Sequence, residues 1–334
     1  MKPRHTGDSG LASRLRQKLR FPVMAGPMFI ASTPAQVIAQ CKGGILGAIP
    51  ALNPRSTALL DEALVEIKAS LAAHDATPGS RPAAPFAVNL VVHRSNDRLD
   101  ADLDLICKHR VPLVILSLGA PKEVMDAVHG YGGLVFNDVI SNRHAHKCAE
   151  NGTDGLIAVA AGAGGHTGNI SPFALVQEIR QWWTGMLALS GCIATGRGIL
   201  AARAMGADFA YIGSPFLACA EANTSAEQKA MIVASDAADV MITDCFTGVA
   251  ATFLRPSIEA NGLDPKNLTR DRSQGINVKG GGSNHKAWRD IWSAGQGVGA
   301  VTESLPTELY LDRLFEDYQA AKAAFRRQLD HADH

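Results

Sequence analysis

The chain has 334 residues, of which 46% are hydrophobic, so it is long and apolar enough to bury one large core, with or without a small companion domain. Its 32 lysines and arginines balance 32 aspartates and glutamates. Without an excess of charge there is no electrostatic footprint for nucleic acid or an anionic membrane surface, and the sequence favours a small-molecule partner.

The sequence also bears on location and redox state. No segment has the roughly 20 consecutive apolar residues of a membrane span, and the basic N-terminus lacks the apolar run of a secretory signal. Leu11, Leu15 and Leu19 recur at helical spacing and predict a short entry helix. The six cysteines stand far apart, with no C-x-x-C pair, so we expect reduced, buried thiols in a cytoplasmic protein.

Short apolar runs alternate with amphipathic helical patterns along the first two thirds of the chain. The predicted strands cover residues 22–28, 45–51, 86–92, 113–119, 133–139, 155–161, 187–193 and 209–217. A helix follows each strand, as at 57–73 and at 171–183, where Ser171 can N-cap and Pro172 suits the first helical position. Eight such units favour an α/β fold, the TIM (β/α)8 barrel. An open doubly wound sheet would need a dinucleotide fingerprint after its first strand, which is missing.

The alternation stops near residue 222. Residues 223–304 contain short helical pieces and glycine-rich stretches, which predict a small, α-rich, lid-like second domain over the barrel mouth. In the last segment, one helical face carries Leu311, Leu314, Phe315, Tyr318 and Phe325. That face predicts a closing helix packed on the barrel. The barrel domain is therefore expected over residues 1–222 and 305–334.

Active sites of TIM barrels lie at the C-terminal ends of the strands, so the residues there are candidates. Ala25, Gly26 and Met28 belong to a turn after the first strand that is nearly free of side chains, either a plain turn or a place for a flat ring. Asn89 ends the third strand, where its amide could bind a heterocycle or close an Asx turn. Asp138 ends the fifth strand.

The seventh and eighth strands end in glycine and serine. Ser190 and Gly191 follow the seventh strand, and Gly213 and Ser214 follow the eighth. Barrels bind phosphate in these two loops through backbone N–H groups. A Walker loop is excluded because Arg197 stands where lysine is required. A phosphate site beside a flat, bare turn indicates flavin mononucleotide, FMN.

His166 stands in a glycine-rich loop after the sixth strand, next to Gly164 and Gly165. A neutral imidazole can remove an acidic carbon-bound proton, and a protonated one can bind an anionic substrate. The alternative is a histidine that only hydrogen-bonds the loop backbone. No metal site is expected, because His144 and His146 are two residues apart on a helix and face different ways.

These motifs resemble those of the FMN-dependent nitronate monooxygenases, formerly called 2-nitropropane dioxygenases. AGAGGHTG at residues 161–168 is similar to the loop of that family that carries the catalytic histidine. PVMAGPM, LSGCIATGRG, YIGSPFLA and WSAGQGVG are similar too, and the resemblance runs from about Phe21 to about Val301.

The resemblance implies a TIM barrel holding FMN without a covalent bond. It implies oxidation of alkyl nitronates, such as propionate 3-nitronate, by O₂ to a carbonyl compound and nitrite through an anionic flavosemiquinone. His166 would be catalytic. The flavin would contact Ala25, Gly26, Met28, Asn89, Asp138, Gly164, Gly165 and Gln296, and its phosphate would contact Ser190, Gly191, Gly213 and Ser214. Asp138 stands where some relatives carry a lysine.

Two other functions stay open, because a fold does not fix a function. The same barrel occurs in NAD(P)H-dependent FMN reductases that act on quinones or on an enoyl thioester. The second alternative is a non-catalytic flavin-binding protein, against which His166 argues, since a pure binding loop gains little from an imidazole. The oligomeric state is also open, with a homodimer as one possibility.

Overall fold

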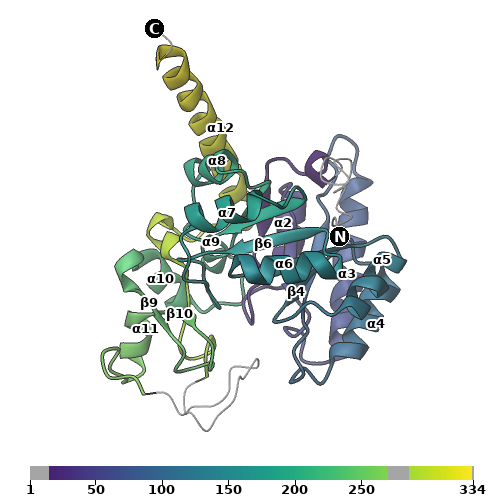
Figure 1. The fold of residues 1–334 in the computed structure, drawn as a ribbon, viewed down its shortest axis with the longest axis horizontal. Helices are drawn as coiled ribbons and strands as arrows, with labels where there is room; N and C mark the ends of the chain where they lie inside the picture. The colour runs from purple at the N-terminus through teal and green to yellow at the C-terminus, as the bar shows by residue number, and fades with distance from the viewer. Residues whose placement is uncertain (1–14, 270–285, 333–334) are drawn as a thin grey trace.

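Eight parallel strands form the wall of a barrel in the computed structural model, which describes residues 15–269 and 286–332 (Figure 1). They are β1 (Val23–Ala25), β2 (Gly47–Pro50), β3 (Phe86–Val91), β4 (Leu113–Ser117), β5 (Leu134–Val139), β6 (Gly155–Val159), β7 (Met186–Ser190) and β8 (Phe209–Ile212). Neighbours in the chain pair from β2 to β8, and β8 pairs with β1. A parallel bridge between Met24 and Leu46 closes the ring. The predicted α/β TIM barrel is confirmed.

Helices cover the outside of the barrel. They are α2 (Pro34–Lys42), α3 (Thr57–Asp75), α4 (Leu99–His109), α5 (Lys122–Gly130), α6 (Asn142–Asn151), α7 (Pro172–Arg180) and α8 (Gly196–Ala204). Thr33, Ser56, Ser141 and Thr195 begin four of them by accepting a hydrogen bond from an amide of the first turn. Ser171 holds the predicted N-cap position of α7, but its side chain makes no capping hydrogen bond.

The strand pleat separates two cores. Met24, Ile115, Phe136, Ile157 and Phe209 pack together inside the barrel. Val23, Val114, Val135, Leu156 and Ala210, their neighbours in the chain, pack outward in the cluster that also contains the helices. Because side chains alternate along a strand, the inward positions nearest the C-terminal end of the barrel fall on Asn89, Ser117, Asp138, Ser190 and Tyr211.

The eighth strand is shorter than predicted. It ends at Ile212, and the residues expected to continue it form the short helix α9 (Ser214–Leu217). Pro215 lies at the start of α9, where its missing N–H costs nothing, whereas in a strand it would remove a ladder hydrogen bond. Gly213 and Ser214 therefore form a strand-to-helix turn.

The segment after α9 has its own elements and lies at one side of the barrel (Figure 1). It contains α10 (Ala226–Ala234), η1 (Ala237–Asp239), β9 (Val240–Thr243), β10 (Ala251–Leu254), α11 (Arg255–Ala260) and η2 (Gln296–Ala300). The antiparallel pair β9–β10 was not expected in an α-rich segment. The domain boundaries at 223 and 305 remain a prediction, and the glycine-rich residues 278–285, like Leu11, lie outside the described residues.

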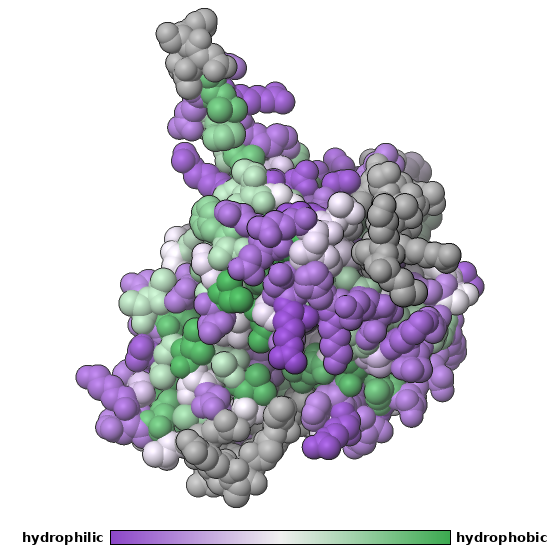
Figure 2. All heavy atoms as spheres, in the orientation of Figure 1, coloured by the Kyte–Doolittle hydropathy of each residue, from purple (hydrophilic) through white to green (hydrophobic). Residues whose placement is uncertain are grey.

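The last helix, α12 (Thr307–Ala332), packs on the barrel through its first half. Leu311, Leu314 and Tyr318 are buried, and Phe315 meets Phe21 edge-to-face at 5.6 Å between ring centroids. Phe325 was predicted on the same packed face, but it is 44% exposed because the second half of α12 projects beyond the barrel (Figure 1). Hydrophobic and hydrophilic side chains stand side by side on that projection (Figure 2).

The six cysteines are free thiols, as predicted, but only Cys41, Cys148 and Cys219 are buried, and Cys192 is exposed. Among the helices of residues 15–269 and 286–332, none combines the length and the apolar character needed to cross a membrane.

Candidate active site

A cavity of about 570 Å³ opens at the C-terminal ends of the barrel strands. This volume is typical of sites for small molecules and cofactors. The predicted site residues that line it are His166, Gly26, Met28, Asn89, Asp138, Gly164, Gly165, Ser190, Gly191, Gly213 and Ser214. Ala25 and Gln296 are not among its lining residues. Ala25 is fully buried in the outer core, and Gln296 is exposed, with its backbone N–H bound to Gly162 O at 2.9 Å.

Unusual backbone conformations gather at this cavity. Among the described residues that are not glycine, five have a positive φ, and four of these line the cavity: Ile30 (67°), Leu118 (64°), Cys192 (59°) and Trp288 (64°). Such conformations are unfavourable for residues with a side chain, and they concentrate at functional sites because the surroundings must hold them. The backbone conformations of these loops therefore lower the stability of the fold to some extent.

The loop that carries His166 is attached by its backbone to the segment that follows α9. Gly165 O accepts a hydrogen bond from Thr252 N at 2.9 Å, and its N–H donates to Ser293 Oγ at 3.2 Å. Gly162 has a φ of +84°, and a Cβ atom there would lie 2.2 Å from Cys192 Sγ, so only glycine fits. These contacts hold His166 between the barrel and β10.

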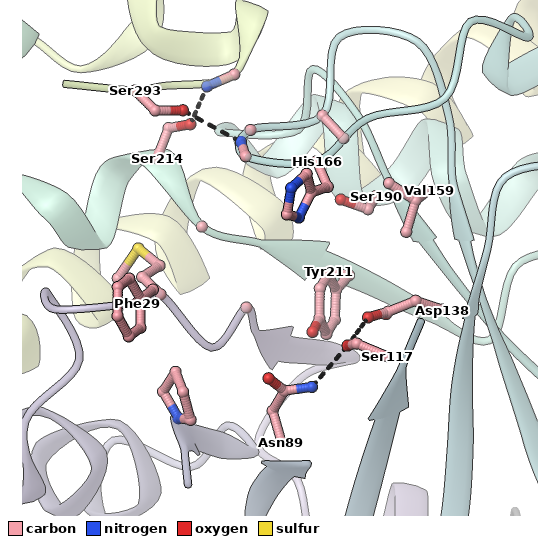
Figure 3. A pocket seen from close by; sticks show the side chains of 18 of the residues that line it. Phe29, Asn89, Ser117, Asp138, Val159, His166, Ser190, Tyr211, Ser214 and Ser293 are labelled. Atoms are coloured by element: carbon pink, nitrogen blue, oxygen red, sulfur yellow. Dashed lines mark hydrogen bonds between the residues drawn. The ribbon is translucent and has the colours of Figure 1, made fainter. Parts of the chain in front are cut away.

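The His166 side chain points into the cavity, above Tyr211 in the view of Figure 3. Its ring meets Trp288 edge-to-face, with the centroids 5.3 Å apart. Its Nε2 atom is buried and has no hydrogen-bond partner in the described part of the chain. Burial lowers the pKa of His166 below its ordinary value of 6.5, because the protonated ring loses its hydration. His166 is therefore a neutral imidazole at pH 7 with a nitrogen free for a ligand.

A chain of hydrogen bonds crosses the floor of the cavity (Figure 3). Asn89 Nδ2 donates to Ser117 Oγ at 2.7 Å, and Ser117 Oγ donates to Asp138 Oδ2 at 2.5 Å. Burial raises the pKa of Asp138 to about 6, and the bond from Ser117 only partly opposes this effect. Burial and the nearby Asp138 also raise the pKa of Tyr211. The floor is therefore polar, with a carboxyl that gains its charge near pH 6 and a tyrosine that stays neutral.

The loops after β7 and β8 offer donors for an anion. Gly191, Cys192 and Gly213 line the cavity, and their backbone N–H groups make no hydrogen bond to any other described residue. Gly191 has a φ of +135°, and a Cβ atom there would lie 2.9 Å from Ala161 O. Unpaired backbone N–H groups are rare in proteins unless a ligand or water meets them, and convergent ones bind phosphate.

Several lining residues were not singled out from the sequence. Ser117 and Tyr211 follow inward-facing residues of β4 and β8 by two positions, so strand alternation alone could have identified them. Phe29, Trp288 and Ser293 also line the cavity, and the last two come from a distant segment without a periodic pattern.

The other histidines considered from the sequence have different surroundings. His146 stacks on Trp182 with the ring centroids 3.8 Å apart, and His93 Nδ1 is 2.8 Å from Ser95 Oγ. His144 lies at the rim of the cavity. Within residues 15–269 and 286–332, no three His, Cys, Asp or Glu side chains are grouped so that they could hold a metal ion.

Solved structures share this fold. FabK from Thermotoga maritima superposes with a TM-score of 0.75 at 22% sequence identity, covering 95% of this chain and 98% of that one. The nitroalkane oxidase from Streptomyces ansochromogenes gives a TM-score of 0.74 at 20% identity, covering 93% of this chain and 99% of that one. At these identities the likeness establishes the fold alone.

Sequence comparison identifies the family. The family model described as nitronate monooxygenase matches residues 13–317. A nitronate monooxygenase of Paraburkholderia phytofirmans is 25% identical over 329 residues, which cover 85% of this chain and 88% of that protein. Three other curated relatives match over 41 to 67% of their own length. The chain belongs to the nitronate monooxygenase family and is a flavin-dependent oxidoreductase.

Proposed function

We propose that the protein binds FMN in the cavity and oxidises alkyl nitronates with O₂ to carbonyl compounds and nitrite. The observation that carries this proposal is the neutral His166 imidazole, whose Nε2 lies buried and unpaired at the cavity wall. A buried, unpaired polar atom is costly unless a ligand meets it. The family match and the curated relative from Paraburkholderia phytofirmans support the same reaction.

The cavity fits FMN in three respects. Its floor offers polar atoms at Asn89 and Asp138 for the edge of a heterocycle. At Gly165 a Cβ atom would meet nothing within 4 Å, so the backbone there is open to a flat ring. The free N–H groups of Gly191, Cys192 and Gly213 suit a phosphate. When bound, FMN would supply the electron acceptor for the reaction.

The residues of the chain then have distinct tasks. His166 Nε2 can take the carbon-bound proton of a neutral nitroalkane, which leaves the electron pair delocalised on the nitro group as a nitronate. Once protonated, the same nitrogen can donate a hydrogen bond to a nitronate oxygen. Trp288 packs edge-to-face on His166 and limits the access of water to the imidazole, and Phe29 in turn meets Trp288 with the ring centroids 6.0 Å apart.

Aerobic turnover tests the proposal. Purified protein loaded with FMN should consume O₂ and release nitrite from propionate 3-nitronate. The His166→Ala variant should bind FMN but release little nitrite from a neutral nitroalkane, whose carbon-bound proton it cannot take. The alternative, an NAD(P)H-dependent reductase, predicts instead that NAD(P)H bleaches the flavin under anaerobic conditions while nitronate is left unchanged. An FMN-loaded protein with neither activity would favour the non-catalytic flavin-binding protein.

A further inference from the structure

Asp138 is an acid in the cavity without a balancing cation. Its Oδ1 atom is buried and has no hydrogen-bond partner, and no ion pair joins Asp138 to a cation among the described residues. The one lysine or arginine that lines the cavity in the described chain is Lys147 on α6, and it makes no ion pair with Asp138. A carboxylate in such a place is costly, because it loses hydration without gaining a counter-charge.

The hydrogen bonds on the floor leave Asp138 Oδ1 as the atom that could carry an additional proton. Asn89 uses both amide hydrogens, one on Ile115 O at 3.0 Å and one on Ser117 Oγ at 2.7 Å. Ser117 has a single hydroxyl hydrogen, which it donates to Asp138 Oδ2. Asn89 therefore offers the cavity an acceptor, its Oδ1, whereas Asp138 can offer a donor only if Oδ1 carries a proton.

This pair complements the edge of a flavin ring. The pyrimidine edge of flavin presents an N–H donor flanked by two carbonyl acceptors. An amide oxygen beside a protonated carboxyl supplies the acceptor and one of the donors that this edge needs. A bound ring would also remove the remaining water from Oδ1, which disfavours the ionised acid further.

We propose that Asp138 is held as a neutral acid in the FMN-bound protein, donates its proton to the flavin ring, and makes FMN binding take up a proton. This inference rests on the proposed function, because it requires FMN in the cavity. It assigns Asp138 to recognition of the cofactor and places His166 alone as the base toward the substrate.

Among the titratable groups on the floor of the cavity, Asp138 is the one that changes its charge near neutral pH. Tyr211 on β8 and Cys148 on α6 both feel the charge of Asp138, and burial raises the pKa of Cys148 to about 12 and that of Tyr211 as well, so both stay neutral. Lys147 on α6 acts on Cys148. His144 and His166 line the same cavity, and both are present in wild type and in the Asp138→Asn variant.

The sign of the pH effect follows from linkage. In the protein without ligand, burial raises the pKa of Asp138 to about 6. If FMN binds the protonated form, the FMN affinity is flat below that pH and falls about tenfold for each pH unit above it. The fall ends at the pKa of Asp138 in the complex, which is higher.

The test is the Kd of FMN between pH 5 and 9, followed by flavin fluorescence, for wild type, Asp138→Asn and the control Asp126→Asn. Asp126 pairs with Lys122 on the exposed face of α5. Asparagine keeps a neutral donor, so the ratio of wild-type Kd to Asp138→Asn Kd should rise above pH 6. Taking this ratio cancels the titration of the FMN phosphate and of the histidines. The control ratio should stay flat.

A flat Asp138→Asn ratio, or a ratio that rises toward acid, would overturn the proposal. Loss of FMN binding in a folded Asp138→Asn protein would do the same. If that variant does not fold, the proton uptake can be measured on wild type instead. Calorimetric titration with riboflavin, which has no phosphate, in buffers of different ionisation enthalpy gives the number of protons taken up on binding. Proton uptake at pH 7 to 8 supports the proposal, and no uptake refutes it. Failure of wild type to bind FMN at any pH would instead defeat the proposed function.

Discussion

The imidazole of His166 meets the indole of Trp288 edge-to-face, with ring centroids 5.3 Å apart and planes at 81°. The two residues come from different parts of the molecule, the loop after β6 and the segment that precedes η2. Trp288 also contacts Phe29, which follows β1. The environment of the proposed base is therefore completed by a residue outside the barrel strands.

Trp288→Ala should move the pH profile of kcat/KM. Burial lowers the pKa of His166, so the wild-type base stays neutral to lower pH. Removal of the indole lets water reach the imidazole, its pKa rises, and the acid limb of the profile moves to higher pH. Trp288→Phe keeps an aromatic ring and should shift less. Identical profiles for all three proteins with a neutral nitroalkane would show that Trp288 does not set this pKa.

His166→Asn should lower kcat/KM for a neutral nitroalkane by about 10²- to 10⁴-fold, the usual contribution of a general base. FMN binding should persist, because the phosphate donors and the floor are unchanged. The matched control is His146→Asn, which alters a histidine stacked on Trp182 that is not among the lining residues of the cavity. Nitrite release at the wild-type rate by His166→Asn would rule out this role.

Gly191→Ala should weaken FMN binding at least tenfold, an effect of roughly 1.4 kcal/mol or more. The new Cβ would lie 2.9 Å from Ala161 O at a φ of +135°, so the loop with the free N–H groups must shift. Gly79→Ala is the control, since Gly79 also has a positive φ, +82°, but has nothing within 4 Å of a Cβ. Equal FMN affinity of the two variants would refute the phosphate assignment.

Asp138→Asn should stabilise the FMN-free protein at neutral pH but not in acid. The pKa of Asp138 is raised from 3.8 to about 6 in the folded state, so the folded protein holds the proton more tightly than the unfolded chain. This acid therefore lowers the free energy of unfolding as pH rises from about 4 to 6, by up to about 3 kcal/mol. Urea unfolding should show a gain for the variant that is about 2 kcal/mol larger at pH 8 than at pH 4.5.

The sequence predicted those parts of the site whose causes are local. Gly165, Gly191 and His166 follow strands that periodicity located, and barrel geometry brings such loops to one mouth. Ala25 does not line the cavity because Met24 and Gly26 share the inward parity of the pleat and Ala25 faces the outer core. The prediction of Ala25 came from a continuous stretch of sequence, which does not distinguish inward-facing from outward-facing residues.

The parts that the sequence could not reveal depend on long-range packing. Trp288 and Ser293 reach the cavity from a segment more than a hundred residues after His166, and their neighbours in the chain show no strand or helix pattern. Phe325 lies on the predicted face of α12, but the barrel ends before that residue, so the helix continues without a partner in the described chain.

The most direct test of the central claim is an anaerobic titration of the FMN-loaded protein with propionate 3-nitronate, followed by the visible spectrum of the flavin. We predict prompt conversion to the red spectrum of a one-electron-reduced, anionic flavin, reversed on admission of air with release of nitrite. A flavin spectrum that stays yellow at every nitronate concentration would contradict nitronate oxidation in this cavity.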